Sequence, residues 1–537
     1  MEAPDVEEAV EALAEAPLET ASRLFLGLAL VAGAAALLRS GYPRRLWRVS
    51  RERLLYGLPI GTLVVVAVNA GFFAVVQRGW SHPDDPLYLP FMSISYDYPL
   101  GVLTSAVAHV DSSHLGGNLT AVLFFAPVAE YVIGHKGGRH PVLRAFVGIP
   151  LLWYALGLVP AAFSWAPGLG FSGAVFAFFG FVVVFYPVVG VLALILTSIA
   201  SSLLTAALNP VSIQTATEEI VRPSWANVAL EAHALGFLLG FGLAVIYARR
   251  YRYPIDRARV AFAVLAFGLL NGLWILSVSD GTEFVLYRGI GVGVVVLLSL
   301  GLTSTATHLQ RGPVLSLSDL SLRRLVASTY LTVPILVFLI GGVWFMAMFS
   351  ALGFVDQPDG VEVGDYTVFY DDEAEVDLAP PFDEMLTENV SFEGVLVESE
   401  SRSLHMTAMS DSDLRDGGGV VRVGDVGWTR EIDVERTGMT TATSESTYSV
   451  VLEEATSNQS TSYDSGPADT GTSIDGWDVE LESRGDVNTA VLDDGDVRHA
   501  VVLDERRTSS HGFEFQVVDD EVRVSRGDDR AVLGQVD

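Results

Sequence analysis

Cysteine is absent from the 537 residues of this chain, and Lys136 is its one lysine. Without cysteine the chain has no disulfides, no thiolate metal site and no cysteine nucleophile. All other basic residues are arginine, and acidic residues outnumber basic ones by 64 to 33. This composition is typical of a halophilic archaeon, because an acidic exposed surface stays hydrated at high salt.

The negative charge is confined to one part of the chain. A net charge of -31 is combined with 50% hydrophobic residues, which no single globular domain explains. Residues 353–537 contain 44 acidic and 12 basic residues, whereas residues 1–352 contain 20 and 21. The whole negative excess therefore lies in the C-terminal region, and we expect no nucleic-acid partner.

Apolar runs with few charges follow one another before residue 353, which is the hydropathy pattern of a helical membrane protein. Most of these runs have about the 20 residues that a helix needs to cross the hydrocarbon core. We predict ten transmembrane helices, at residues 22–39, 54–77, 114–134, 142–163, 171–187, 189–207, 227–248, 259–278, 283–302 and 329–352. The first is the weakest, since only 15 residues separate Arg23 from Arg39.

The basic residues indicate how these helices are oriented. They cluster after the first, third, seventh and ninth predicted helices, within residues 44–53, 136–144, 249–259 and 311–324. The positive-inside rule makes these loops cytoplasmic. We therefore predict a multi-pass protein of the cell membrane, with both termini and the acidic C-terminal region outside the cell.

The C-terminal region alternates apolar and polar residues over short segments, as half-buried strands do. Such segments lie at residues 361–370, 390–397, 420–426, 448–452, 477–481, 488–492, 499–503 and 513–524. They predict an all-β sandwich or barrel. The Ser/Thr-rich residues 440–473 are expected to be at least partly a loop or a disordered insertion.

Ser172 follows a loop with Pro167, Gly168 and Gly170, and it opens the predicted helix that runs inward from the outer face. A helix start leaves backbone N-H groups unpaired, and these favour negative charge nearby. A small residue at a helix contact is the alternative interpretation of this serine, and it is common in membrane proteins.

His233 lies about two turns into another inward-running helix, so its depth matches that of Ser172 at about 1.5 Å per residue. Gly236 and Gly240 lie on the same face and allow a second helix to approach closely. That face could hold the imidazole against the Ser172 hydroxyl. A histidine that simply bonds a backbone carbonyl is the alternative.

His114 and Asn118 are four residues apart, so both project from one face at the outer end of a third helix. Both side chains can donate hydrogen bonds to a developing oxyanion, a contribution of about 3 to 4 kcal/mol per donor in acyl transfer. Helix capping and bonding to the loop is the alternative role.

The sequence lacks the motifs of other classes of hydrolase. The segment Gly170-Phe171-Ser172-Gly173-Ala174 lacks the second glycine of the G-x-S-x-G elbow. No His-Glu-x-x-His motif occurs, and the spacing of His109 and His114 does not suit two zinc ligands on one helical face. We therefore predict neither a metal site nor a cofactor.

Three segments together resemble the rhomboid intramembrane serine proteases. Residues 103–119, with His109, His114 and Asn118, are similar to the segment that leads into the second core helix of that family. Residues 170–174 are similar to its serine motif, and residues 232–240 to its histidine motif. The resemblance covers about residues 54–250.

The resemblance implies a Ser172–His233 dyad, with Ser172 as nucleophile and His233 as general base and then general acid. His114, Asn118 and the backbone N-H of Ser172 would form the oxyanion hole, near the extracellular face. The implied reaction is hydrolysis of peptide bonds in or near transmembrane segments of protein substrates. A catalytically inactive rhomboid-like protein that binds membrane clients is the alternative, and a transporter or receptor with a surface β domain is a weaker one.

The predicted fold is thus an α-helical polytopic membrane protein, with a rhomboid-like six-helix core and about four extra helices, followed by an all-β soluble domain. Its predicted parts are residues 1–53 with the acidic N-terminus, one extra helix and a basic loop, residues 54–250 with the core, residues 251–352 with three more helices, and residues 353–537 with the β domain. The lipid bilayer is an expected partner. The sequence leaves the oligomeric state open, and the β domain either recruits substrates or only solubilises the surface.

Overall fold

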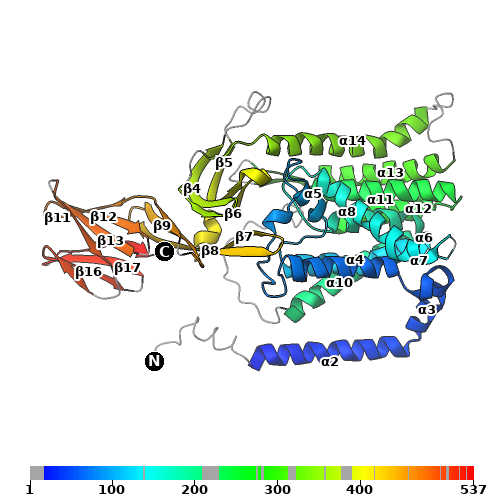
Figure 1. The fold of residues 1–537 in the computed structure, drawn as a ribbon, viewed down its shortest axis with the longest axis horizontal. Coiled ribbons are helices and arrows are strands. Elements are labelled where there is room, and N and C mark those ends of the chain that lie inside the picture. The colour runs from blue at the N-terminus through cyan, green and yellow to red at the C-terminus, as the bar shows by residue number, and fades with distance from the viewer. Residues whose placement is uncertain are drawn as a thin grey trace. The chain divides into compact units, whose positions relative to one another are not determined.

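A computed structural model describes residues 17–536, except residues 137–138, 209–228, 272, 274–275, 280–283, 312–321, 356–358, 377–389, 416–417, 458, 486, 496, 504–506, 519 and 528. The chain divides into two compact units, Met1–Met346 and Ala347–Asp537. The first is helical and the second is built of strands (Figure 1).

The first unit is a bundle of apolar helices. Its longer helices are α2 (Pro17–Arg39), α3 (Tyr42–Arg53), α4 (Ile60–Gly71), α6 (Ser112–Ile133), α8 (Ile149–Ala162), α9 (Ser172–Phe185), α10 (Pro187–Leu208), α11 (Leu230–Arg250), α12 (Arg257–Leu270), α13 (Arg288–Arg311) and α14 (Leu322–Ser350). Short elements complete it, namely η1 (Leu55–Gly57), η2 (Phe72–Val76), η3 (Leu89–Phe91), α5 (Pro99–Ser105), α7 (Pro141–Leu143) and η4 (Arg144–Gly148).

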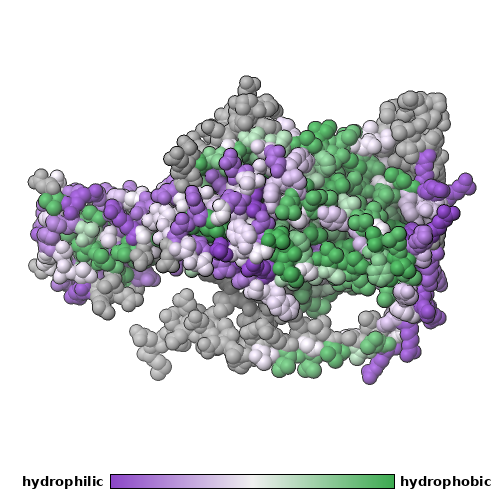
Figure 2. Space-filling model, viewed as in Figure 1, coloured by the Kyte–Doolittle hydropathy of each residue, from purple (hydrophilic) through white to green (hydrophobic). Residues whose placement is uncertain are grey.

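Six described helical segments are long and apolar enough to cross a membrane. They are Ser112–Ile133, Pro141–Ala162, Pro187–Ala206, Leu230–Arg250, Arg288–His308 and Ser328–Ser350, and Ile60–Val76 and Ser172–Phe185 are shorter apolar helices. In Figure 2 hydrophobic side chains cover the visible face of this unit, and hydrophilic ones gather at the end that carries α3. The predicted helical membrane protein is confirmed.

The sequence prediction was wrong around residues 271–287. Two predicted helices, 259–278 and 283–302, extend into a hairpin of strands β1 (Leu276–Ser279) and β2 (Phe284–Tyr287). Helix α12 already ends at Leu270, and the Asn271 side chain donates to the carbonyl of Phe267 over 2.9 Å. Strands of four residues are too short for their pattern to be told from the end of a helix, so hydropathy alone could not find this boundary.

The second unit is all-β, as predicted, apart from a helical turn at η5 (Glu400–Arg402) and the short helix α15 (Asp411–Arg415). One four-stranded sheet has the order β3 (Val361–Val363), β4 (Tyr366–Val376), β5 (Val390–Ser399), β6 (Leu404–Met409). Another has the order β11 (Ala468–Ile474), β12 (Trp477–Arg484), β13 (Val487–Asp493), β14 (Arg498–Val502).

The largest sheet has eight strands, ordered β10 (Ser460–Asp464), β9 (Ser446–Glu454), β8 (Trp428–Thr441), β18 (Asp529–Val536), β17 (Glu521–Arg526), β16 (Phe513–Val518), β15 (Thr508–Ser510), with β7 (Gly419–Asp425) also on β8. Every register recorded in the unit is antiparallel. Short loops join most of the paired strands and require this direction, whereas β8 and β18 pair although they are far apart in the sequence.

Residues 440–473, which were expected to be at least partly a loop or a disordered insertion, consist mostly of strand, because β9, β10 and most of β11 lie there. Their buried hydroxyls are satisfied by hydrogen bonds. Thr447 donates to the carbonyl of Gly466 over 2.6 Å, and Ser449 donates to the Asp464 carboxylate over 2.7 Å. A β-branched threonine suits a strand, and a paired hydroxyl can be buried at small cost. Composition alone therefore underestimates the strand content of this Ser/Thr-rich segment.

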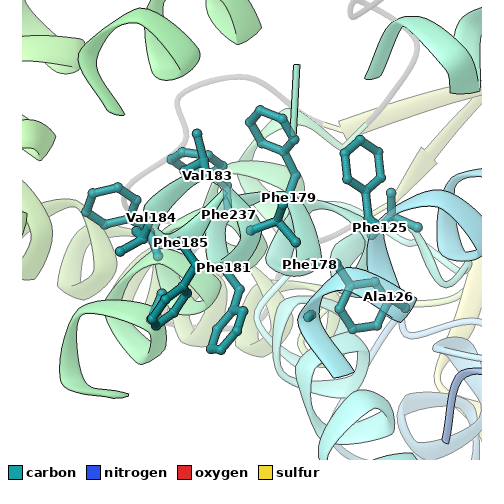
Figure 3. Close-up of a cluster of buried hydrophobic side chains, with 14 of the residues drawn as sticks. Phe125, Ala126, Phe178, Phe179, Phe181, Val183, Val184, Phe185 and Phe237 are labelled. Atoms are coloured by element: carbon teal, nitrogen blue, oxygen red, sulfur yellow. The ribbon is translucent and has the colours of Figure 1, made fainter. Parts of the chain in front are cut away.

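Helix α9 lies at the centre of the membrane unit's core. All of its residues are buried except Ser172 and Phe176, which are one turn apart. Its phenylalanines pack with Phe125 of α6 and Phe237 of α11 (Figure 3). Burial of this helix on nearly every side fixes the position of its first residue, Ser172, relative to the neighbouring helices.

A buried carboxylate joins the end of α6 to the start of α4. The Glu130 side chain is fully buried and accepts hydrogen bonds from the backbone N-H groups of Gly61 and Thr62, each over 2.8 Å, and from the Thr62 hydroxyl over 2.7 Å. The buried His135 ring lies 2.6 Å from the same carboxylate. These bonds satisfy N-H groups at a helix start that would otherwise lack partners.

We predict that Glu130→Ala lowers the free energy of unfolding by about 3 kcal/mol or more, because it leaves several buried donors without an acceptor. Thermal unfolding of the full chain in detergent measures this loss. Glu52→Ala, at an exposed carboxylate on α3, is the control and should change stability by less than about 0.5 kcal/mol. Equal effects of the two substitutions would contradict a role for Glu130 in joining α4 to α6.

Candidate active site

The loop before α9 places Ser172 at a helix start. Gly170 has a φ of 120°, in the region that favours glycine, and its N-H donates to the carbonyl of Ser105 over 2.8 Å. The chain then turns into α9, where the N-H groups of Ala174 and Val175 donate to the carbonyl of Phe171, while those of Ser172 and Gly173 precede the first bond of the helix. Ser172 therefore combines a hydroxyl with nearby free backbone donors.

His233 lies within hydrogen-bond distance of this serine. The His233 Nε2 and Ser172 Oγ atoms are 2.7 Å apart, although the two residues are 61 positions apart in the sequence. Phe176, one turn after Ser172, stacks on the imidazole with ring centroids 4.3 Å apart and planes 7° from parallel. A hydroxyl and an imidazole at this distance have the geometry of an activated nucleophile and its base.

Close packing of two helices brings these residues together. A Cβ atom added at Gly236 would lie 2.2 Å from the carbonyl oxygen of Gly173, and one at Gly240 would lie 1.9 Å from that of Ala177. On the α9 side, a Cβ at Gly180 would lie 2.2 Å from the carbonyl oxygen of Phe237. Only glycine allows the two backbones to be this close.

His114 and Asn118, both on α6, lie against the loop that leads to Ser172. A Cβ added at Gly170 would lie 2.7 Å from the His114 ring and 3.5 Å from Asn118 Nδ2. His114 Nδ1 and Asn118 Nδ2 are buried and have no hydrogen-bond partner among the described residues. A buried donor without a partner is costly, which is a reason to expect that a ligand oxygen binds here.

All four residues line one cavity of about 890 Å³. Its wall also contains the loop residues Pro167, Gly168 and Gly170. This volume lies within the range of about 300–1,000 Å³ that ligand pockets usually have. No group of three or more His, Asp or Glu side chains that could hold a metal ion occurs in the described part of the chain. The other polar side chains that line the cavity are Ser164, Asn271, Ser299 and Tyr330.

Sequence reasoning missed residues that hold the serine loop. The Glu231 carboxylate, two positions before His233, accepts from the Ser164 hydroxyl and from the backbone N-H of Trp165, each over 3.3 Å. The Trp165 indole in turn donates to the carbonyl of Phe338 in α14 over 3.2 Å. An acidic residue and a tryptophan beside the two site motifs were visible in the sequence, but nothing there paired them.

A second group missed in the sequence fixes the loop before α6. The Gln77 side chain donates to the carbonyl of His109 over 2.8 Å and accepts from the His109 N-H over 2.9 Å. The His109 ring contacts that of His114 edge to face, with centroids 5.1 Å apart. Burial, followed by the neighbouring His114, lowers the pKa of His109 to about 3, so this ring is neutral at physiological pH. His109 thereby adds no positive charge beside His114.

A known protein family matches the part of the chain that contains these residues. Residues 98–250 match the family model described as the rhomboid domain, and the match contains all of the site residues named above for α6, α9 and α11. The comparisons with curated proteins and with solved structures give no match. A rhomboid domain and six long apolar helices identify an integral membrane protein with the domain of rhomboid intramembrane proteases and pseudoproteases.

We predict that Gly240→Ala destabilises the membrane unit by about 1–3 kcal/mol, because the new methyl group would clash with the backbone of α9. Gly293→Ala in α13 is the matched control, since a Cβ there has no atom within 4 Å. Alanine favours a helix over glycine by up to about 1 kcal/mol, so the control should be neutral or stabilising. Thermal unfolding in detergent compares the two, and a neutral Gly240→Ala would contradict the close packing of α9 and α11.

Proposed function

We propose that this chain, which contains a rhomboid domain, is an intramembrane serine protease. The observation that carries the proposal is the distance of 2.7 Å between Ser172 Oγ and His233 Nε2 in a cavity that also contains the buried, unpartnered donors of His114 and Asn118. A nucleophile, a base and donors for an oxyanion are the three parts that acyl transfer requires.

In the first half of the reaction, Ser172 Oγ attacks the carbonyl carbon of the scissile peptide bond while its proton passes to His233 Nε2. The carbonyl oxygen becomes an oxyanion, which accepts hydrogen bonds from His114, Asn118 and the backbone N-H of Ser172. The intermediate then collapses, the C–N bond breaks, and His233 returns the proton to the leaving amine.

In the second half, His233 takes a proton from water, whose oxygen attacks the acyl-enzyme carbonyl. Collapse of this second intermediate releases the carboxylic acid product and restores the Ser172 hydroxyl. The described site has no carboxylate on the imidazole, and the stacked ring of Phe176 restricts the orientation of His233 instead. The dyad therefore relies on packing where a serine triad relies on an aspartate.

The proposed substrates are membrane proteins cut in or near a transmembrane segment. Ser172 stands at the start of its helix, so a substrate must place an unwound stretch of chain at that depth. The arginine clusters support a site near the extracellular face and an extracellular C-terminal region. The acidic, lysine-poor composition supports a halophilic source. A non-cleaving client binder is less consistent with a bonded serine and histidine.

A serine-reactive fluorophosphonate probe should label the full-length chain in detergent, and Ser172→Ala should abolish the labelling because the attacking oxygen is gone. His233→Ala should reduce the labelling rate by several orders of magnitude, since the hydroxyl loses its base. Ser202→Ala removes an exposed serine of α10 and serves as the control. Labelling that survives in Ser172→Ala would reject the proposed nucleophile.

Asn118→Ala should slow labelling by about 10²–10³-fold, the usual cost of one oxyanion donor. Its thermal unfolding midpoint should stay close to that of the wild type, because Asn118 Nδ2 makes no hydrogen bond within the described residues. Rate and stability are measured on the same detergent preparation. A rate equal to that of the wild type would argue against the amide as an oxyanion donor, whereas a large loss of stability would indicate a structural role.

A further inference from the structure

The cavity at Ser172 extends beyond the rhomboid domain. Part of its wall comes from α12, α13 and α14, which follow residue 250 and lie outside the family match. Helix α13 contributes Val294, Val295, Leu298, Ser299 and Leu302. Their spacing of one, three and four residues places them on one stripe of the helix, so a whole helical face is turned to the cavity.

The wall from these added helices is mainly apolar. Three of its side chains are polar, and two of them, Ser299 and Asn271, donate to carbonyls of their own helices, those of Val295 and Phe267, each over 2.9 Å. The third is the phenol of Tyr330 on α14. The Ser299 hydroxyl and one N-H of the Asn271 amide are thereby engaged, and the remaining wall residues from α13 are aliphatic. An apolar ligand suits this part of the cavity better than a charged one, because no charged side chain of these helices lines it to pair with a ligand charge.

Helix α14 is held firmly at the edge of the site. A Cβ added at Gly342 would lie 2.3 Å from the carbonyl oxygen of Phe163, and one at Gly341 would lie 2.6 Å from the Trp165 ring. That ring also stacks on Phe345, with centroids 5.5 Å apart and planes 17° from parallel. The loop that leads to Ser172 therefore packs directly on α14, which makes this helix a fixed part of the wall.

The two ends of the cavity suit a peptide better than a lipid chain. The end with His114 and Asn118 has unpartnered hydrogen-bond donors, and the end at α13 is apolar. A lipid acyl chain would fill the apolar end and leave the donors without acceptors. A peptide with large apolar side chains supplies both a carbonyl oxygen for the donors and apolar groups for the wall.

We infer that α12, α13 and α14 form a specificity pocket for a large apolar side chain of the substrate next to the scissile bond. This inference rests on the proposed protease function, because it assumes that the chain attacked by Ser172 extends into the cavity. It assigns to the helices outside the rhomboid domain a role in selecting the substrate, separate from the chemistry of Ser172 and His233.

Two fluorophosphonates test this pocket, one with a methyl group and one with a naphthylmethyl group on phosphorus. Ser172 Oγ displaces fluoride from either, and its proton passes to His233. The measured quantity is the ratio of labelling rates, bulky over small, for the full-length chain in detergent. Leu298→Trp narrows the pocket and should lower this ratio at least tenfold, whereas Leu298→Ala widens it and should raise the ratio.

Leu300→Trp is the matched control, because Leu300 is 58% exposed and points away from the stripe that lines the cavity. It should leave the ratio at the wild-type value. An unchanged ratio in both Leu298 variants, or an equal fall in both tryptophan variants, overturns the proposed specificity pocket. The apolar end of the cavity would then be a site for lipid. A wild-type chain that neither probe labels at Ser172 counts against the proposed protease itself, so the two failures are distinguishable.

Discussion

The close approach of α9 and α11 is the constraint on which the rest of the membrane unit depends. Gly236 and Gly240 on one helix, and Gly180 on the other, bring backbone atoms to distances that any side chain would prevent. Apolar helices gain little from the hydrophobic effect inside a bilayer, so this dense packing is a main source of their association. The same packing brings His233 Nε2 to 2.7 Å from Ser172 Oγ. Stability and the geometry of the site thus come from one contact.

Buried polar groups in the membrane unit differ in whether they have hydrogen-bond partners. Glu130 is fully buried and accepts hydrogen bonds from the N-H groups of Gly61 and Thr62, near the end of α6 opposite to His114. The donors of His114 and Asn118 are buried without a partner. Membrane proteins tolerate such groups mainly where they serve a function. The donors of His114 and Asn118 also line the cavity, and this combination distinguishes a candidate binding site from a structural cluster within the same bundle.

The sequence predicted the helical membrane unit, the all-β region and the residues that the cavity brings together, because each leaves a local pattern. Hydropathy marks spans, alternation marks strands, and Ser172, His233, His114 and Asn118 lie in short motifs. What the sequence could not show depends on pairing over long distances. Trp165 bonds to Phe338 and stacks on Phe345, about 170 residues later, and neither position has a local signature. The hairpin of β1 and β2 was missed for another reason, since its strands are too short for a period to emerge.

The residues proposed to act on the peptide bond and those proposed to select the substrate lie in different segments of the chain. The groups proposed to act on the peptide bond all lie within residues 98–250, which match a rhomboid domain. The apolar end of the cavity is built by helices that follow this segment, and α14 packs on the loop before Ser172 through Gly341 and Gly342. On the proposed function, a change in α13 would therefore alter which side chains fit while Ser172 and His233 stay in place. Helices that follow the rhomboid domain would change its specificity in this way because one of them, α14, is anchored to the loop that leads to Ser172.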